Sequence, residues 1–131
     1  MKNYLSKIFV IHYTKLSERK RHMENEIKKW KLQSVPIHFE EEMDQENITD
    51  FDITRAVNIS RFRQNTNRNP TRGELSLCLK YKNILENIAT MSDDEYILVL
   101  EDDVIFKESP LDYIENLLQR CDHENIDFDC I

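Results

Sequence analysis

Residues 96–106 constrain this chain most, because five consecutive apolar residues run into Glu101, Asp102 and Asp103, and three apolar residues follow. A short apolar run without alternation predicts a strand buried on both faces, as in a parallel sheet. Acids at its carboxyl end cannot stay buried and unpaired, and ligands of open α/β sheets bind at that end. We therefore expect the three acids to hold a hard divalent cation, which in turn holds phosphate oxygens. The alternative is that they only solvate the strand end and cap the segment after it.

Length and composition indicate a globular chain of 131 residues with one domain over residues 1–131. The single glycine, Gly73, excludes a P-loop and a Gly-rich dinucleotide turn. Three cysteines without close pairs argue against a disulfide framework and a zinc ribbon. No apolar run approaches the ~20 residues of a membrane span, and the N-terminal apolar piece is too short for a signal peptide. We therefore expect no membrane span and a reduced, cytoplasmic location.

The net charge of −7 is distributed in blocks, basic over residues 1–31 and 55–82 and acidic over residues 32–54 and 83–131. A pI of about 5.1, without a basic face interleaved with aromatics, argues against nucleic acid as a partner. The basic blocks could place cationic side chains beside the acidic strand end, which suits an anionic ligand bridged by a metal. Alternatively, the blocks are solvated helix faces.

The first third of the chain reads as strand, helix, strand. Residues 7–13 are β-branched and aromatic, which predicts a first strand in a central parallel position. Ser17 is expected to cap the helix that follows, and residues 35–39 read as a second short strand.

Polar residues follow both of these strands. The turn at residues 13–21 offers amides, a hydroxyl and several bases, so Thr14 and Arg19 are candidate nucleotide contacts; a solvated first helical turn is the alternative. Among the acids of residues 40–44, Asp44 is a candidate hydrogen-bond partner for a ribose hydroxyl, and the others are expected to be solvated.

The middle of the chain is polar, and residues 65–70 read as a mobile loop. Its arginines could face a diphosphate or simply be solvated: Arg61, Arg63, Arg68 and Arg72. Thr71 and Glu74 fit a capping box that begins a helix of about 17 residues. Its expected core face comprises Leu75, Cys78, Tyr81, Leu85 and Ile88.

The last part of the chain continues the alternation. Residues 91–95 read as the turn into the acidic strand, Ser109 and Pro110 begin a further helix, and residues 126–131 begin an extended segment. The order strand, helix, strand, loop, helix, strand predicts an α/β fold with right-handed crossovers.

The order of these pieces resembles glycosyltransferase family 25, which includes lipooligosaccharide and procollagen galactosyltransferases. The matching segments are residues 8–11 with the bases after them, residues 73–81, the acidic motif at 98–104 and residues 128–131. They cover nearly the whole chain but only the N-terminal half of the family, so we expect a fold truncated before its second half.

The resemblance implies a GT-A-like, Rossmann-like, mainly parallel sheet flanked by helices. It implies transfer of a hexose such as galactose from a nucleotide sugar, commonly a UDP-sugar, to a glycan or protein acceptor with Mn²⁺ or Mg²⁺. Glu101, Asp102 and Asp103 would occupy the place of the DxD-type metal motif, with Asp103 and then Asp102 as the first candidates. Asp102 would also contact the metal-bound diphosphate.

The resemblance leaves the catalytic base unknown. The family's reaction inverts and needs a base, which the C-terminal half commonly supplies, and Lys80 and Tyr81 stand where the family usually has a Ser-His pair.

Two other readings compete. The segment 97–103 also resembles the start of a phosphoacceptor receiver domain, but too few residues follow Asp103 for the later phosphorylated Asp and Lys. The stronger rival is a truncated, non-catalytic transferase-like domain that binds a nucleotide or a protein partner.

Overall fold

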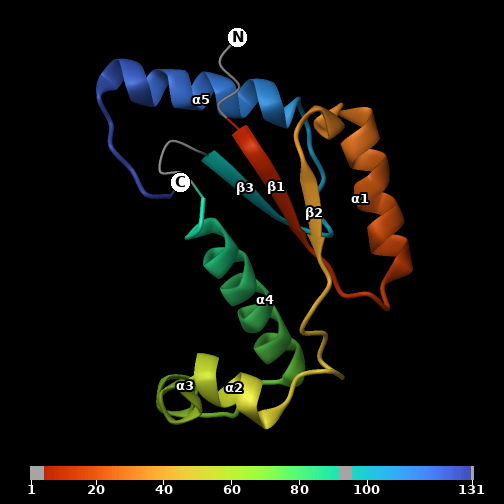
Figure 1. Cartoon of the computed structure of the whole chain (residues 1–131), viewed down its shortest axis with the longest axis vertical. Coiled ribbons are helices and arrows are strands. Elements are labelled where there is room, and N and C mark those ends of the chain that lie inside the picture. Colours follow the sequence, from red (N-terminus) through yellow and green to blue (C-terminus); the bar gives the residue numbers. More distant parts are fainter. Residues whose placement is uncertain (1–4, 92–95, 131) are drawn as a thin grey trace.

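Three parallel strands form the centre of the computed structural model, which describes residues 5–91 and 96–130 (Figure 1). They are β1 (Leu5–Ile11), β2 (Ile37–Glu40) and β3 (Tyr96–Glu101), and their order in the sheet is β2-β1-β3. The predicted central position of β1 is confirmed. The register aligns Ile11 with Glu40 on one side and with Glu101 on the other. All three strands therefore reach the same carboxyl edge.

Helices cover both faces of this sheet, so the fold is the expected α/β arrangement of a Rossmann-like glycosyltransferase. Alternate residues of β1 point in opposite directions. Ile8 and Val10 pack in a core with Met23 of α1 (Ser17–Lys29), whereas Phe9 and Ile11 pack with Ile84 of α4 (Arg72–Ile88). A 3-10 turn, η1 (Leu32–Ser34), links α1 to β2.

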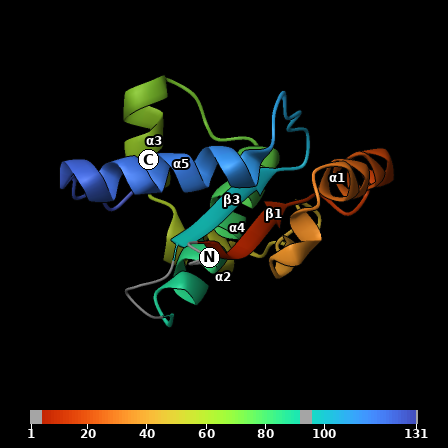
Figure 2. The same cartoon turned by 90° about the horizontal axis from the view of Figure 1, so that it is seen from above.

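The helix α5 (Pro110–Glu124) lies beyond the amino ends of β1 and β3, and Figure 2 shows it crossing above them. Ser109 caps it by accepting a hydrogen bond from Asp112 N, and Pro110 is its first residue, as predicted. Beyond α5, residues 126–130 form no regular strand, but Phe128 stacks on Tyr96 with ring centroids 5.7 Å apart. No helix in the two described ranges is long and apolar enough to cross a membrane.

Two short helices occupy the region expected to be polar loop. They are α2 (Asp50–Ala56), which Thr49 caps with a full capping box, and α3 (Ile59–Thr66), which Asn58 caps. A third core cluster, around Ile48, Leu75 and Leu79, holds this region against the first half of α4. These two helices were not predicted, and they form because local caps and a small apolar cluster suffice for helices of two turns. The loop predicted at residues 65–70 is confirmed beyond Thr66, where α3 ends.

Two further expectations differ from the structure, and a third is not tested by it. The strand β3 is at an edge among the described residues and is mostly half-buried, so it is not buried on both faces. Ser17 is the first residue of α1 and does not cap it; Leu16 holds the cap position without a side-chain bond. The turn expected at residues 91–95 lies largely outside the described residues, as does Ile131.

The core face of α4 also differs from the expected one. Its buried residues are Leu75, Ser76, Leu79, Lys80 and Ile84. Cys78, Tyr81 and Leu85 are exposed instead. The helix itself, with 17 residues and a capping box between Thr71 and Glu74, is as predicted.

Candidate functional site

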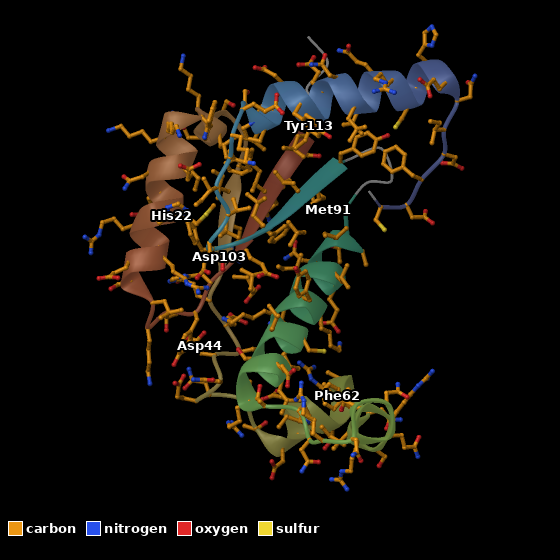
Figure 3. The ribbon with its side chains drawn as sticks, turned by 180° about the vertical axis from the view of Figure 1, so that it is seen from behind. His22, Asp44, Phe62, Met91, Asp103 and Tyr113 are labelled. Carbon is orange, nitrogen blue, oxygen red and sulfur yellow. The ribbon has the colours of Figure 1, made fainter. Side chains whose placement is uncertain are left out.

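The carboxyl edge of the sheet gathers the residues that follow the three strands. Because Ile11, Glu40 and Glu101 share a register position, His12 and Asp102 come next to one another at the ends of β1 and β3. Figure 3 shows Asp103 at the tip of β3, between α1 and α4, and Asp44 in the segment after β2. The edge thus unites residues about 90 positions apart in the chain.

Asp102 is buried at this edge, with 5% of its surface exposed, and both of its carboxylate oxygens are engaged. Its Oδ2 lies 2.7 Å from Nδ1 of His12, and its Oδ1 accepts a hydrogen bond of 3.1 Å from Nη1 of Arg19. Because an ionised carboxylate can only accept, Nδ1 of His12 carries the proton. The buried charge of Asp102 is therefore paired on both sides, as burial requires.

His12 is the partner that sequence reasoning missed. It is 1% exposed, and among the described residues its Nε2 is the only buried side-chain nitrogen or oxygen without a hydrogen-bond partner. Buried polar atoms are nearly always paired, so this nitrogen is an exception that points to a group not supplied by the chain. A single histidine after an apolar strand gave no signal of this role in the sequence.

The loop that carries Asp103 is fixed to α1. His22, labelled in Figure 3, donates from Nε2 to the carbonyl of Val104 at 2.7 Å. The carboxylate of Glu26 accepts from the backbone amide of Phe106 at 3.1 Å. Burial would raise the pKa of Glu26, but hydrogen bonds from Phe106 and Trp30 outweigh it and lower the pKa. These bonds hold the loop so that Asp103 stays at the edge.

Glu101 and Asp103 flank the buried Asp102 and are both exposed. Oδ2 of Asp103 lies 3.4 Å from Nη1 of Arg19. Burial and the nearby Glu101 carboxylate together raise the pKa of Tyr81 on α4. Two carboxylates are thus accessible to a ligand, and the third is fixed beneath them.

A second buried pair, between Asp44 and Lys80, supports the same edge. Oδ1 of Asp44 accepts from Nζ of Lys80 at 2.8 Å, while Oδ2 accepts from the amide and the hydroxyl of Thr14. Lys80 also donates to the carbonyls of His12 at 2.8 Å and Glu42 at 2.7 Å. Burial would raise the pKa of Asp44, but the bonds from Lys80 and Thr14 outweigh it and lower the pKa.

A cavity of about 220 Å³ opens at this edge. It lies between the end of β3, the turn after β1 and the first half of α4, and its polar lining residues are His12, Tyr13, Arg19, Gln45, Ser76, Lys80, Glu101 and Asp102. Sites for whole drug-sized ligands are roughly 300–1,000 Å³. The cavity is therefore smaller than a site that encloses a whole drug-sized ligand.

The donor set fits a divalent cation only in part. Over residues 5–91 and 96–130, no group of three His, Cys, Asp or Glu side chains is arranged to hold a metal ion. However, Mg²⁺ is commonly bound by one or two carboxylates together with substrate phosphates, and Asp102 and Asp103 supply such oxygens. The guanidinium of Arg19 stands between these two carboxylates, which marks a place for positive charge. The residues thus supply part of the coordination shell of a divalent cation, and the phosphate oxygens of a ligand would complete it.

The structure brings the nominated residues together as two linked groups. Arg19, Asp102 and Asp103 form one, with Glu101 beside it, and Thr14 joins Asp44 in the other. His12 links them, because its side chain meets Asp102 and its carbonyl accepts from Lys80.

Three of the four candidate arginines of the middle region have hydrogen-bond partners of their own, and Arg61 is exposed. Arg68 binds Glu74 through two hydrogen bonds, Arg72 donates to the carbonyls of Gln45 and Ile48, and Arg63 donates to Asn69.

The fold is an α/β arrangement with a candidate ligand site at the carboxyl edge of its sheet, and the comparison with protein families identifies its class. Residues 5–129 match the model of glycosyltransferase family 25, described as an LPS biosynthesis protein, and the chain belongs to that family. Searches among curated proteins and solved structures found no match. Membership implies a nucleotide-sugar donor and bears out the resemblance drawn from the residues.

Proposed function

We propose that this chain binds the diphosphate of a nucleotide sugar, together with Mn²⁺ or Mg²⁺, at the carboxyl edge of its sheet. The observation that supports this most is the meeting of Asp102, Asp103 and Arg19 beside a cavity. Oxygen ligands suit Mg²⁺ and Mn²⁺, and Asp103 and then Asp102 are the first candidates. A bound cation would neutralise the charge of the departing nucleoside diphosphate.

Other residues at this edge are assigned to binding the donor or to positioning the residues that bind it. Arg19 offers a guanidinium that can pair with phosphate oxygens in a bidentate manner. Thr14 and Asp44 lie at the neighbouring strand end, and we assign them to the nucleoside part of the donor. Lys80 and His12 are buried beneath, and they fix the positions of Asp44 and Asp102.

The proposed reaction is transfer of a hexose, with a UDP-sugar such as UDP-galactose as donor, to a glycan or protein acceptor. The family description as an LPS biosynthesis protein supports a glycan acceptor. A GT-A type of donor site would use the acidic motif in this way. Binding without transfer is the alternative, and it would make the chain a non-catalytic domain that holds a nucleotide or a protein partner.

Calorimetric titration of UDP, UDP-galactose and UDP-glucose, each with and without Mn²⁺, tests the binding proposal. We expect Mn²⁺-dependent binding, and we expect Asp103→Ala to abolish it because the variant lacks a proposed metal ligand. Asp103 is exposed, so its replacement should leave the core intact. The matched control is Asp122→Ala, an exposed position on α5 far from the edge. Unchanged UDP affinity of Asp103→Ala with Mn²⁺ would contradict the assignment.

Release of UDP from the sugar nucleotide, followed with and without candidate acceptors, separates transfer from binding alone. Mn²⁺-dependent binding without any turnover would favour the non-catalytic alternative.

A further inference from the structure

Arg19 bridges the two acids to which the proposed function assigns a metal ion. Its Nη1 lies 3.1 Å from Oδ1 of Asp102 and 3.4 Å from Oδ2 of Asp103. One positively charged nitrogen thus faces two carboxylates, which is also the arrangement that a small divalent cation would adopt between them. A divalent cation bound to these oxygens would therefore compete with Arg19.

The two side chains that pair with Asp102 differ in how easily they can move away from it. His12 is 1% exposed and packs edge-on against Phe39, so it is fixed in the core. The side chain of Arg19 is 49% exposed and reaches the edge from the first turn of α1. An arginine stem of this length can swing its charged end into solvent. Arg19 is therefore the removable partner, and His12 is the permanent one.

A second observation indicates that this edge is built for a group that the chain does not supply. Nε2 of His12 has no hydrogen-bond partner although it is buried, and His12 lines the same cavity as Arg19 and Asp102. The edge thus combines a displaceable internal cation with an unsatisfied nitrogen.

We infer that Arg19 takes the place of the divalent cation while none is bound, and that it turns to the nucleotide diphosphate when the cation enters. The inference rests on the proposed metal and nucleotide site, and it adds that the cation binds before Arg19 contacts the diphosphate. The pairing of Arg19 with Asp102 and Asp103 excludes the metal, and metal binding frees the guanidinium for phosphate. Arg19 accordingly weakens binding of the metal alone and strengthens binding of the nucleotide.

The test measures these two opposite effects in the full chain. Calorimetric titration with Mn²⁺ alone compares the unaltered protein with Arg19→Gln and with Arg21→Gln. Arg21 is the matched control, because it is exposed two positions along α1 and forms no ion pair with the described residues. A second titration follows UDP binding at saturating Mn²⁺.

We expect Arg19→Gln to bind Mn²⁺ about fivefold to tenfold more tightly than the unaltered protein, and Arg21→Gln to differ by less than about twofold. At saturating Mn²⁺ we expect Arg19→Gln to bind UDP more weakly, whereas a merely structural role would move both affinities in the same direction. Arg19→Lys retains the charge, so its Mn²⁺ affinity should stay close to that of the unaltered protein. Thermal melting of each variant confirms that it is folded.

The outcomes separate this inference from the proposed function. If the unaltered protein binds Mn²⁺ and UDP but Arg19→Gln behaves as Arg21→Gln does, the competition is refuted and the binding site stands. If Arg19→Gln binds Mn²⁺ more weakly, Arg19 supports the metal rather than replacing it, and the inference is overturned. If no form binds Mn²⁺, with or without UDP, both fall.

Discussion

At the scale of single residues, Lys80 has the most demanding environment. The residue is 2% exposed, and its ammonium group faces the carboxylate of Asp44 together with the carbonyls of His12, Glu40 and Glu42. These acceptors come from the ends of β1 and β2, so one side chain of α4 connects both strands. Removing one partner of a buried ion pair leaves an uncompensated charge behind.

We therefore predict that Lys80→Met lowers the free energy of unfolding by about 3–5 kcal/mol. Urea unfolding followed by circular dichroism measures this change. Lys82→Met serves as the control on the same helix, because Lys82 pairs with Glu86 at the surface and its loss should cost under ~1 kcal/mol. Equal stabilities of the two variants would show that the buried network is not a major stabilising feature.

The residues of the site could be predicted from the sequence only where they lie near the carboxyl end of a predicted strand. Thr14, Arg19, Asp44 and Asp102 lie at the ends of predicted strands or within six residues after them, and the rule that ligands bind at carboxyl ends was enough to nominate them. Lys80 was not nominated because its acceptors are mainly backbone carbonyls, which no side-chain pattern reveals. The roles of the nominated residues in binding remain predictions.

At the scale of elements, α4 shows why periodicity gave the right helix but the wrong face. Leu75, Cys78, Tyr81, Leu85 and Ile88 recur at spacings of three and four, which predicts a helix and one apolar face. The buried stripe instead contains Ser76, whose hydroxyl donates to the carbonyl of Met43 at 2.6 Å, as well as Lys80. Polar residues with backbone partners are as buried as leucines here.

The orientation of α4 gives a prediction about its cysteine. Cys78 lies on the exposed face and Cys121 of α5 is buried. Because thiol reagents need access, Cys78 should react in the native protein, and Cys121 should react only after unfolding. Timed labelling with a thiol reagent followed by peptide mass analysis measures this. A Cys78 as unreactive as Cys121 would contradict the observed face, and the exposed Cys130 serves as the positive control.

The remaining elements show what local patterns can and cannot decide. Strand β3 was predicted correctly as an element, but its edge position depends on which strands lie beside it, and apolar composition does not encode neighbours. Helices α2 and α3 were missed because each is only seven or eight residues long. Their caps, Thr49 and Asn58, were the available signals.

At the scale of the whole molecule, the alternating charge blocks meet across the fold. Arg19 and Lys20 of the first basic block pair with Asp102 and Glu41, and Lys80 of the second basic block pairs with Asp44. The expectation that basic blocks place cations beside the acidic strand end is confirmed for Arg19 of the first block, whereas Lys80 of the second block pairs with Asp44 after β2. Patterning along the chain could suggest these meetings, but only the sheet register decides which charges meet.

The same pairing predicts how the chain responds to acid. Hydrogen bonds from Tyr13 and Lys15 lower the pKa of Glu46 to about 2, and those from Arg68 and the Thr71 amide lower that of Glu74 to about 2. A carboxyl group whose folded pKa is lowered stabilises the fold above its unfolded pKa of about 4.3, and this contribution is lost as pH falls toward 2.

We therefore expect the urea midpoint to be nearly constant from pH 7 to 5 and to decline between pH 4.5 and 2. Glu74→Gln should begin with a lower midpoint and decline less steeply, because it no longer has that carboxylate to protonate. A midpoint that rises on acidification would contradict the assignment.

The pairing of Asp102 with His12 and Arg19 affects whether folding has to precede or follow the binding of a cation. The acids at the strand end carry their own counter-charge from the moment α1 packs on the sheet, so the chain can fold without waiting for an inorganic partner. The proposed divalent cation would therefore bind to an already folded protein, and folding would not depend on it.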